Sequence, residues 1–247
     1  MPHYFQRASY RFGPGNLSST IKTLIWANVT AFILTTLAPS LAIFFGLSPV
    51  AVLEHLWIWQ PVTYMFLHGS LFHILFNMLA LWMFGTELER LWGTKFFVKY
   101  YFITGIGAAA TTLVGALLPF EFASQMYYSI TIGASGAVYG LLLAYALYYP
   151  NRPIYMYLLF PIPAKYFVMI IGGIAFLSSI NDTQSGVAHV THLGGLIIGY
   201  LYLNQGRSGG LSGELKYHYL KWKIDRMKKK FDVHQGGQGG KWDKHIH

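Results

Sequence analysis

Long apolar stretches recur along this sequence, and every lysine and arginine lies in alternate connections between them, beyond the outermost ones or, for Lys165, at the edge of such a connection. A helix needs about 20 mostly apolar residues to cross a membrane, with a range of about 17–25. Six stretches come close to that length, at 23–39, 68–86, 100–119, 127–149, 164–180 and 187–203. The sequence therefore predicts an all-α, polytopic membrane protein with six transmembrane helices.

The positions of the basic residues predict how these helices are oriented. Basic residues precede the first stretch, separate the second from the third and the fourth from the fifth, and follow the sixth. The other three connections contain no Lys or Arg, and their only charged residues are Glu54, Glu121 and Asp182. Basic residues accumulate on the cytoplasmic side of membranes. We therefore expect a multi-pass protein of a cell membrane with both termini in the cytoplasm; the six-helix form and the lack of cysteines favour a bacterial plasma membrane.

Composition excludes several other classes of protein. Only 11% of the 247 residues are charged, against about 25% in soluble domains. The absence of cysteine excludes disulfides and thiolate metal sites. The net charge is +9, but ten of the eighteen basic residues follow Gln205, and none belongs to a stacking platform of the kind that single-strand binders use. We expect no nucleic-acid partner.

The chain divides into a cytoplasmic N-terminal segment (1–22), a membrane domain (23–204) and a basic cytoplasmic tail (205–247). The tail carries an apolar stripe at helical spacing flanked by lysines, which predicts an amphipathic helix. Such a helix suits the anionic lipids of an inner leaflet, and a solvated cytosolic helix fits the pattern equally well. The stripe consists of Leu220, Ile224, Met227 and Phe231.

Two connections have unusual compositions. The connection at 40–65 is long and aromatic, which favours short amphipathic pieces lying in the outer interface. The connection at 150–163 contains four prolines, so it is not a continuous helix, and we expect an interfacial loop on the cytoplasmic side.

Polar residues fall at matching depths in three of the expected helices. The second, fourth and sixth helices all enter from the outer face. His73 and Asn77 lie in the first turns of the second, Ser135 about two turns into the fourth, and His192 little more than one turn into the sixth. Polar side chains inside a membrane are costly and usually functional. We expect these four residues to meet just below the outer surface.

These residue types together favour nucleophilic catalysis. A serine hydroxyl is a poor nucleophile until a neighbouring base such as His192 accepts its proton. His73 and Asn77, four residues apart, share one helix face and are candidate donors to the oxyanion beside Ser135, as is the Ser135 backbone amide. No carboxylate lies beside the serine or the histidine in the sequence. We expect a Ser-His dyad in which packing orients the imidazole.

Small residues surround the expected dyad. Gly133 and Gly136 bracket Ser135, and Tyr139 lies one turn further, where it can pack on the imidazole ring. Small residues four apart let two helices approach closely. Such pairs are Gly136 with Gly140, and Gly195 with Gly199.

Other interpretations of the same residues remain open. Gly-Ala-Ser-Gly is ordinary at helix interfaces, and a histidine in a membrane helix is often a packing residue. A metal site is a further alternative for His68, His73, His189 and His192. However, no cysteine, intramembrane carboxylate or H-E-x-x-H motif is present to complete it, so we expect no metal and no cofactor.

Taken together, the motifs resemble those of the rhomboid family of intramembrane serine proteases. His73-Ile-Leu-Phe-Asn77 resembles the family's HxxxN, Gly133-Ala-Ser135-Gly136 its GxSG, and His192-Leu-Gly-Gly195 its last-helix histidine and glycines. The segment Glu89-Arg90-Leu-Trp-Gly93 is similar to the end of the family's second helix. The resemblance covers most of residues 20–204.

The resemblance implies a six-helix rhomboid-like bundle and a role for each motif residue. Ser135 would be the nucleophile, His192 the base, and His73 with Asn77 would surround the oxyanion. Tyr139 matches the tyrosine that stacks on the catalytic histidine, Gly199 is one of the last-helix glycines, and His68 matches a histidine near the site. The resemblance also implies a water-accessible cavity and substrates that are transmembrane segments of other proteins. One departure is Trp59-Gln60, where many members have Trp-Arg; it puts loop stability or substrate entry in question.

Two further functions are alternatives to an intramembrane serine endopeptidase. A catalytically silent rhomboid-like protein would bind membrane helices without cutting them, but such relatives generally lack the serine or the histidine. A transporter or channel would need a polar path across the bundle, and the cytoplasmic halves of the fourth and sixth stretches are apolar.

Overall fold

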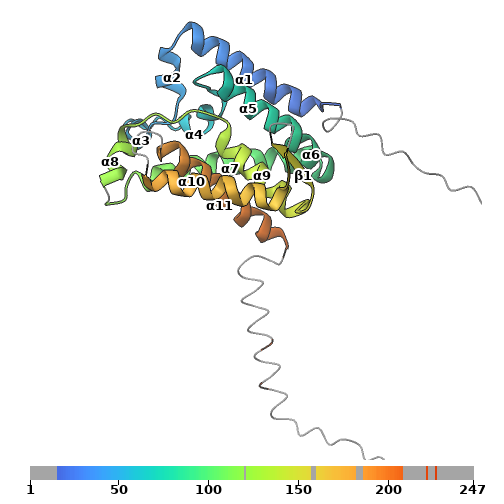
Figure 1. The fold of residues 1–247 in the computed structure, drawn as a ribbon. Helices are drawn as coiled ribbons and strands as arrows, with labels where there is room; N and C mark the ends of the chain where they lie inside the picture. The colour runs from blue at the N-terminus through green and yellow to red at the C-terminus, as the bar shows by residue number, and fades with distance from the viewer. Residues whose placement is uncertain are drawn as a thin grey trace, which may run out of the picture. The chain divides into compact units, whose positions relative to one another are not determined.

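The computed structural model describes residues 16–119, 121–156, 160–181, 186–207, 221 and 226. The chain divides into two compact units, residues 1–203 and 204–247, and the following account concerns the first. Most of its described residues are helical (Figure 1). The principal elements are α1 (Ser19–Leu37), α5 (Leu71–Ala80), the π-helical η2 (Leu81–Gly85), α6 (Thr86–Trp92), α7 (Thr94–Gly115), α9 (Ser135–Tyr148), α10 (Ala164–Asn181) and α11 (Gly186–Arg207).

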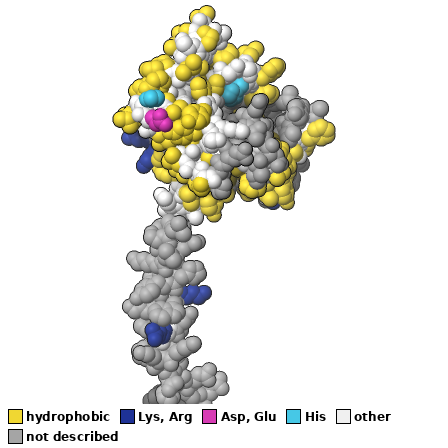
Figure 2. Space-filling model, turned by 90° about the vertical axis from the view of Figure 1, so that its left-hand side faces the viewer, with side chains coloured by type: hydrophobic (Ala, Val, Ile, Leu, Met, Phe, Trp, Pro, Cys, Tyr) yellow, Lys and Arg dark blue, Asp and Glu magenta, His cyan; other side chains and the backbone are white. Residues whose placement is uncertain are grey.

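Several of these helices are apolar enough to belong in a membrane. Among the described residues, three helical runs have the length and composition needed to cross one: Ser19–Leu37, Leu71–Trp92 and Thr94–Gly115. Ser135–Tyr148 and Ala164–Ser179 are shorter apolar helices. On the face in Figure 2, apolar side chains cover much of the described surface and charged side chains are sparse. Lipid is the environment in which so much exposed apolar surface is stable, and the number of spans stays a prediction.

Tyrosine hydroxyls tie the central helices together in the apolar interior. The fully buried Tyr64 donates its hydroxyl to the carbonyl oxygen of Gly105 in α7 at 2.7 Å. Tyr100 of α7, equally buried, donates to the carbonyl oxygen of Gly140 in α9 at 2.8 Å. Buried polar groups are stable only when hydrogen-bonded. These tyrosines therefore fix α7 against both the segment before α5 and the helix that carries Ser135.

Glycines allow α9 and α11 to approach until their backbones touch. A Cβ atom built on Gly195 of α11 would lie 2.0 Å from the carbonyl oxygen of Gly136 in α9. A Cβ atom on Gly199 would lie 3.3 Å from the Cα atom of Gly140. The close approach expected from the two small-residue pairs is confirmed.

Glu89 of α6 joins the start of α1 to the start of α7. Its buried carboxylate accepts hydrogen bonds from the hydroxyls of Ser18, which caps α1, and Thr94, which begins α7, the latter at 2.8 Å. Glu89 itself lies in α6, at the end of a helix as expected. Negative charge is favourable at helix N-termini, so the starts of α1 and α7 stabilise this carboxylate.

The connection at 40–65 forms short helical pieces, as predicted: α2 (Ser40–Phe45), α3 (Pro49–His55), α4 (Gln60–Thr63) and the first residues of η1 (Tyr64–Phe66). Gln60 is fully buried, and its side-chain oxygen accepts from the Ser48 amide at 2.9 Å. Its amide nitrogen donates to the carbonyl oxygens of Ile43 and Phe44. Gln60 therefore links the end of α2 to the residue that precedes α3.

The expectation of a loop at 150–163 is wrong, although the absence of a continuous helix is confirmed. The segment contains an antiparallel pair, β1 (Pro153–Met156) and β2 (Phe160–Pro163). Antiparallel strands exchange hydrogen bonds only at alternate pairs, and the amide of Ala164 donates to the carbonyl of Arg152 at 2.9 Å. The prolines therefore fall on the intervening pairs, where no N–H is needed: Pro153 opposite Pro163, and Tyr155 opposite Pro161.

The fourth helix begins later than the sequence analysis predicted. The expected stretch 127–149 divides into the end of α8 (Glu121–Tyr128), an extended segment, and α9. Thr131 and Leu47 exchange two backbone hydrogen bonds, at 2.9 and 2.8 Å, and Gly133 has φ 131°. Ser135 is consequently the first residue of α9, and its expected place two turns into a helix is wrong.

Some sequence-based expectations fall outside the described residues. They concern the structure of residues 1–15, the outer position of Asp182, and the amphipathic helix of the tail, of which only 205–207, Lys221 and Arg226 are described.

Candidate active site

A sharp change of backbone direction presents Ser135 at the start of α9. Gly133 adopts φ 131°, a conformation that costs a residue with a Cβ atom far more than glycine. Its amide donates to the carbonyl oxygen of Tyr64 at 2.9 Å. The first amides of a helix have no acceptor within that helix and carry its partial positive charge. Ser135 is thus held where backbone donors are available to an anion.

The side chains of Ser135 and His192 are in direct contact. His192 Nε2 lies 2.7 Å from Ser135 Oγ, a short hydrogen-bonding distance. The two residues belong to α9 and α11, and the backbone contact between Gly136 and Gly195 lies immediately beside them. The close approach of the helices is what makes this contact geometrically possible.

Packing fixes the orientation of the His192 ring. Tyr139 stacks on it with ring centroids 4.3 Å apart and planes inclined by 5°. His189 meets it edge-on at 5.8 Å. The buried Nδ1 atom of His192 has no hydrogen-bond partner among the described residues. With Nε2 engaged by the serine, the stacked phenol ring orients the imidazole.

His73 lies over the turn that precedes Ser135. A Cβ atom built on Gly133 would be 2.8 Å from His73 Nε2 and 3.5 Å from Ser135 Oγ. Gly133 therefore has no room for a side chain, and the His73 imidazole lies on the same side of the turn as the serine hydroxyl. Asn77 is placed differently, because its side-chain amide donates back to the His73 carbonyl oxygen at 2.9 Å. The structure thus brings His73, Ser135 and His192 together, with Asn77 one turn behind.

His68 supports His73 from below the surface. It is buried and meets the His73 ring edge-on, with centroids 4.9 Å apart. Within the described ranges, neither of its ring nitrogens has a hydrogen-bond partner, and no three His, Cys, Asp or Glu side chains gather as metal ligands. The arrangement places a hydroxyl beside an imidazole that can accept its proton, with a second imidazole and the first amides of a helix close to the same hydroxyl.

Sequence reasoning did not identify Tyr64 or the pairing of Leu47 with Thr131 as parts of this site. Tyr64 holds Gly133 through its carbonyl oxygen, and its hydroxyl would be 3.0 Å from a Cβ atom on Gly136. The sequence indicated this turn only through Gly133, two residues before Ser135, because glycine permits a backbone conformation that would end a helix. The partners of that turn are distant in sequence, so no local pattern reveals them.

Comparison with known proteins gives a consistent result. A family model described as Rhomboid domain matches residues 55–207. The rhomboid protease AarA of Providencia stuartii is 33% identical over 157 residues, covering 58% of this chain and 54% of that protein.

Two further relatives show similar identities. Rhomboid protease GlpG of Haemophilus influenzae is 31% identical over 149 residues, covering 59% of this chain and 68% of that protein. Rhomboid protease GluP of Bacillus subtilis is 31% identical over 144 residues, covering 58% of this chain and 25% of that protein. The chain spans about half the length of AarA and a quarter of that of GluP.

Proposed function

The chain belongs to the rhomboid family, and from that membership we propose that it is an intramembrane serine endopeptidase that works with a Ser-His dyad. The observation that carries the proposal is the 2.7 Å contact between Ser135 Oγ and His192 Nε2. It supports a nucleophile paired with its base, the signature of activated-serine catalysis.

The proposed reaction uses the groups described above. His192 Nε2 accepts the hydroxyl proton as Ser135 Oγ forms a bond to the scissile carbonyl carbon. The developing oxyanion is stabilised by the Ser135 backbone amide and by His73, each such donor being worth about 10²–10³ in rate. His192 then gives its proton to the departing amine as the C–N bond breaks, which leaves an acyl-enzyme. Water, deprotonated by His192, releases the second product and restores the serine.

Asn77 and Tyr139 have supporting roles in this proposal. The hydrogen bond from the Asn77 side-chain amide to the His73 carbonyl stabilises the first turns of α5. The second hydrogen of the same amide group remains available to the oxyanion. The stack of Tyr139 on His192 keeps Nε2 directed at the serine through both proton transfers. His68 and the glycines at 133, 136, 195 and 199 provide the packing.

We also propose six membrane spans with both termini in the cytoplasm of a bacterial cell, and transmembrane segments of other proteins as substrates. The ion pair between Arg152 and Glu87 at 3.0 Å supports this topology, because it joins two of the connections assigned to the cytoplasmic side. For the basic tail from residue 205, the proposed partner is anionic lipid.

Active-site labelling tests the proposal. A fluorophosphonate should modify Ser135 of the full chain in liposomes, with the adduct mapped by peptide mass spectrometry. Ser135→Ala and His192→Ala should each abolish labelling. Ser129→Ala is the matched control, because among the described residues the hydroxyl of this serine, six positions before Ser135, is bonded to the Met126 carbonyl alone. A folded protein that binds a membrane helix yet is never labelled would instead favour the catalytically silent alternative.

A further inference from the structure

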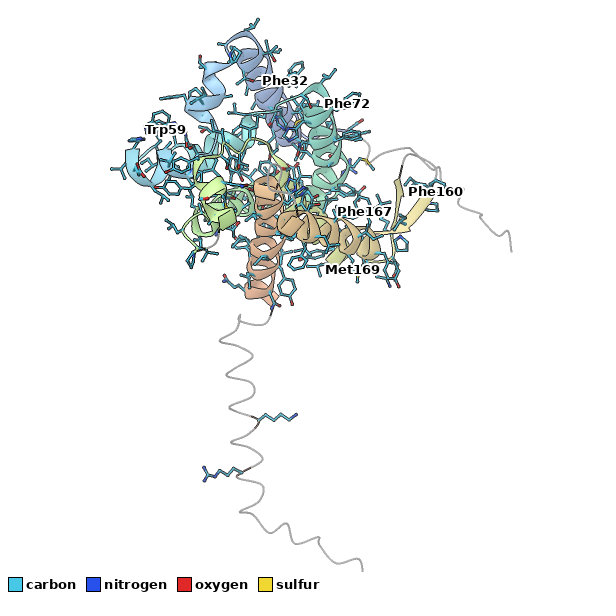
Figure 3. All side chains as sticks on the ribbon, turned by 60° about the vertical axis from the view of Figure 1, so that its left-hand side comes forward. Phe32, Trp59, Phe72, Phe160, Phe167 and Met169 are labelled. Carbon is cyan, nitrogen blue, oxygen red and sulfur yellow. The ribbon has the colours of Figure 1, made fainter. Side chains whose placement is uncertain are left out.

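The β1–β2 hairpin has an apolar end that extends beyond the helices. Ile154 is buried and its partner Ile162 is half-buried, so the base of the hairpin packs on the bundle. Phe160, on the same face as Ile162, is 65% exposed, and Tyr155 is 53% exposed. Figure 3 shows Phe160 on the hairpin, to the side of α10, the helix that carries Phe167 and Met169. An apolar face therefore continues past the edge of the protein core.

The sequence that runs from β1 into β2 is apolar, whereas hairpin connections in water favour Gly, Asn, Asp and Pro. Residues 155–160 are instead Tyr-Met-Tyr-Leu-Leu-Phe, without a polar turn former or a charge. Tyrosine and other aromatic residues are enriched at the boundary between membrane and water. The hairpin connects α9 to α10, so its base lies where two apolar helices end.

The prolines at the edges of the hairpin favour lipid over a protein strand as its partner. Three of the four outward backbone positions of the two strands are Pro153, Pro161 and Pro163, which have no N–H to donate. A protein strand could not add to such an edge with a regular ladder. The same lack of donors makes entry into lipid less costly, because each unsatisfied N–H in an apolar medium costs free energy.

The base of the hairpin is fastened to the start of α10. The Ala164 amide donates to the Arg152 carbonyl at 2.9 Å and the Lys165 amide to the Pro150 carbonyl at 3.1 Å. Arg152 also pairs with Glu87 of α6. An interaction that fixes the hairpin in place therefore also fixes the first turn of α10. This helix has many exposed apolar side chains.

We propose that the β1–β2 hairpin is a lipid-inserted anchor: the exposed side chains of Tyr155 and Phe160 enter the acyl–headgroup boundary of the leaflet that the hairpin faces, and this insertion fixes the first turn of α10. The occupant of the apolar face is the lipid itself, and the anchor acts independently of the peptidase chemistry. Burial of an apolar face by about 5–10 Å is usual for interfacial segments.

Spin-label depth measurement tests the insertion. The chain has no cysteine, so Phe160→Cys and Tyr155→Cys can each be labelled in the full chain without a background. In phosphatidylcholine liposomes at low protein density, collision with oxygen should exceed collision with a water-soluble nickel chelate, at a depth of about 5–10 Å below the phosphates. Asn151→Cys at the hairpin base and Lys95→Cys at the start of α7, both exposed, should report water.

Three results would overturn the inserted position. Nickel accessibility at 160 equal to that at 151 places the hairpin end in water. Exclusion of both reagents places it against protein. Insertion that appears only at high protein density indicates a second copy of the chain.

A second reporter tests the coupling to α10. A spin label on Met169→Cys, at a position that is 69% exposed, should be ordered when the hairpin is otherwise unchanged. The label should become clearly more mobile when Tyr155→Asn and Phe160→Asn are combined in the same chain. Asn151→Ser is the matched control and should change nothing. An unchanged Met169 spectrum in the polar-end variant would refute the anchoring of α10.

Discussion

Substitution of Gly195 by alanine should separate the two side chains of the site. The new Cβ atom would lie 2.0 Å from the Gly136 carbonyl oxygen, whereas a close C···O contact is about 3.3 Å. Backbone cannot swing aside as a side chain does, so α9 and α11 must move apart by about 1.3 Å. The Ser135–His192 contact lies beside this point, and a misplacement of about 1 Å can cost about 10²-fold in rate.

The stability effect of the same substitution should be small by comparison. Overpacking typically costs about 1–3 kcal/mol, and the gain in helix propensity from glycine to alanine returns about 1 kcal/mol. We therefore expect a protein that still folds but reacts with a fluorophosphonate about 100-fold more slowly. The assay is the second-order rate constant of labelling, measured beside thermal unfolding in the same detergent.

Gly173→Ala is the matched control for this prediction. A Cβ atom at Gly173 of α10 meets nothing within 4 Å, so labelling should be unchanged and stability equal or slightly higher. A folded Gly195→Ala protein that labels at the parental rate would show that close approach of α9 and α11 does not set the reactivity of Ser135.

Three further predictions concern other contacts. Tyr139→Phe should keep the stack on His192 and label normally, whereas Tyr139→Ala should label about tenfold more slowly; equal rates for the two variants would remove the orienting role of the ring. Gln60→Ala should lower the free energy of unfolding by about 1–3 kcal/mol, because the buried backbone amide of Ser48 loses the Gln60 side-chain oxygen as its acceptor. An unchanged denaturation midpoint would contradict this. The hydrogen bond from Tyr127 to Glu54 at 2.7 Å raises the pKa of Tyr127, so its stabilisation should be present below pH about 10 and lost as pH rises through the raised pKa. The difference in unfolding temperature between the parent and Tyr127→Phe should shrink as the pH rises above about 10. A difference that grows with pH would show that the hydrogen bond does not stabilise the neutral tyrosine.

The sequence predicted the parts of this fold that depend on local periodicity. Apolar stretches near the length of a span became α1, the run from Leu71 to Trp92 and α7. The pairs of glycines in α9 and α11 predicted a close helix contact, because the absence of a side chain is visible in the sequence itself. The candidate residues Ser135 and His192 followed from residue type and depth, and their contact distance lies within hydrogen-bonding range.

The expectations that failed depend on partners distant in sequence. Apolar residues at 127–134 resemble a helix, yet Leu47 draws Thr131 into an extended pair and Tyr64 holds Gly133. In the proline-rich connection, the spacing of the prolines matches the alternate pairs of a hairpin, but proline alone does not distinguish a hairpin from an irregular loop. The side-chain amide of Asn77 donates to the His73 carbonyl, a contact that residue spacing alone does not specify, and the place of Asn77 beside the oxyanion stays a prediction.

Cleavage of a single-span substrate in liposomes tests the central claim most directly. The parent chain and Ser129→Ala should cut it at similar rates, whereas Ser135→Ala and His192→Ala should produce no fragment while unfolding at parental temperatures. Continued cleavage by folded Ser135→Ala protein would contradict the assignment of this hydroxyl as the nucleophile.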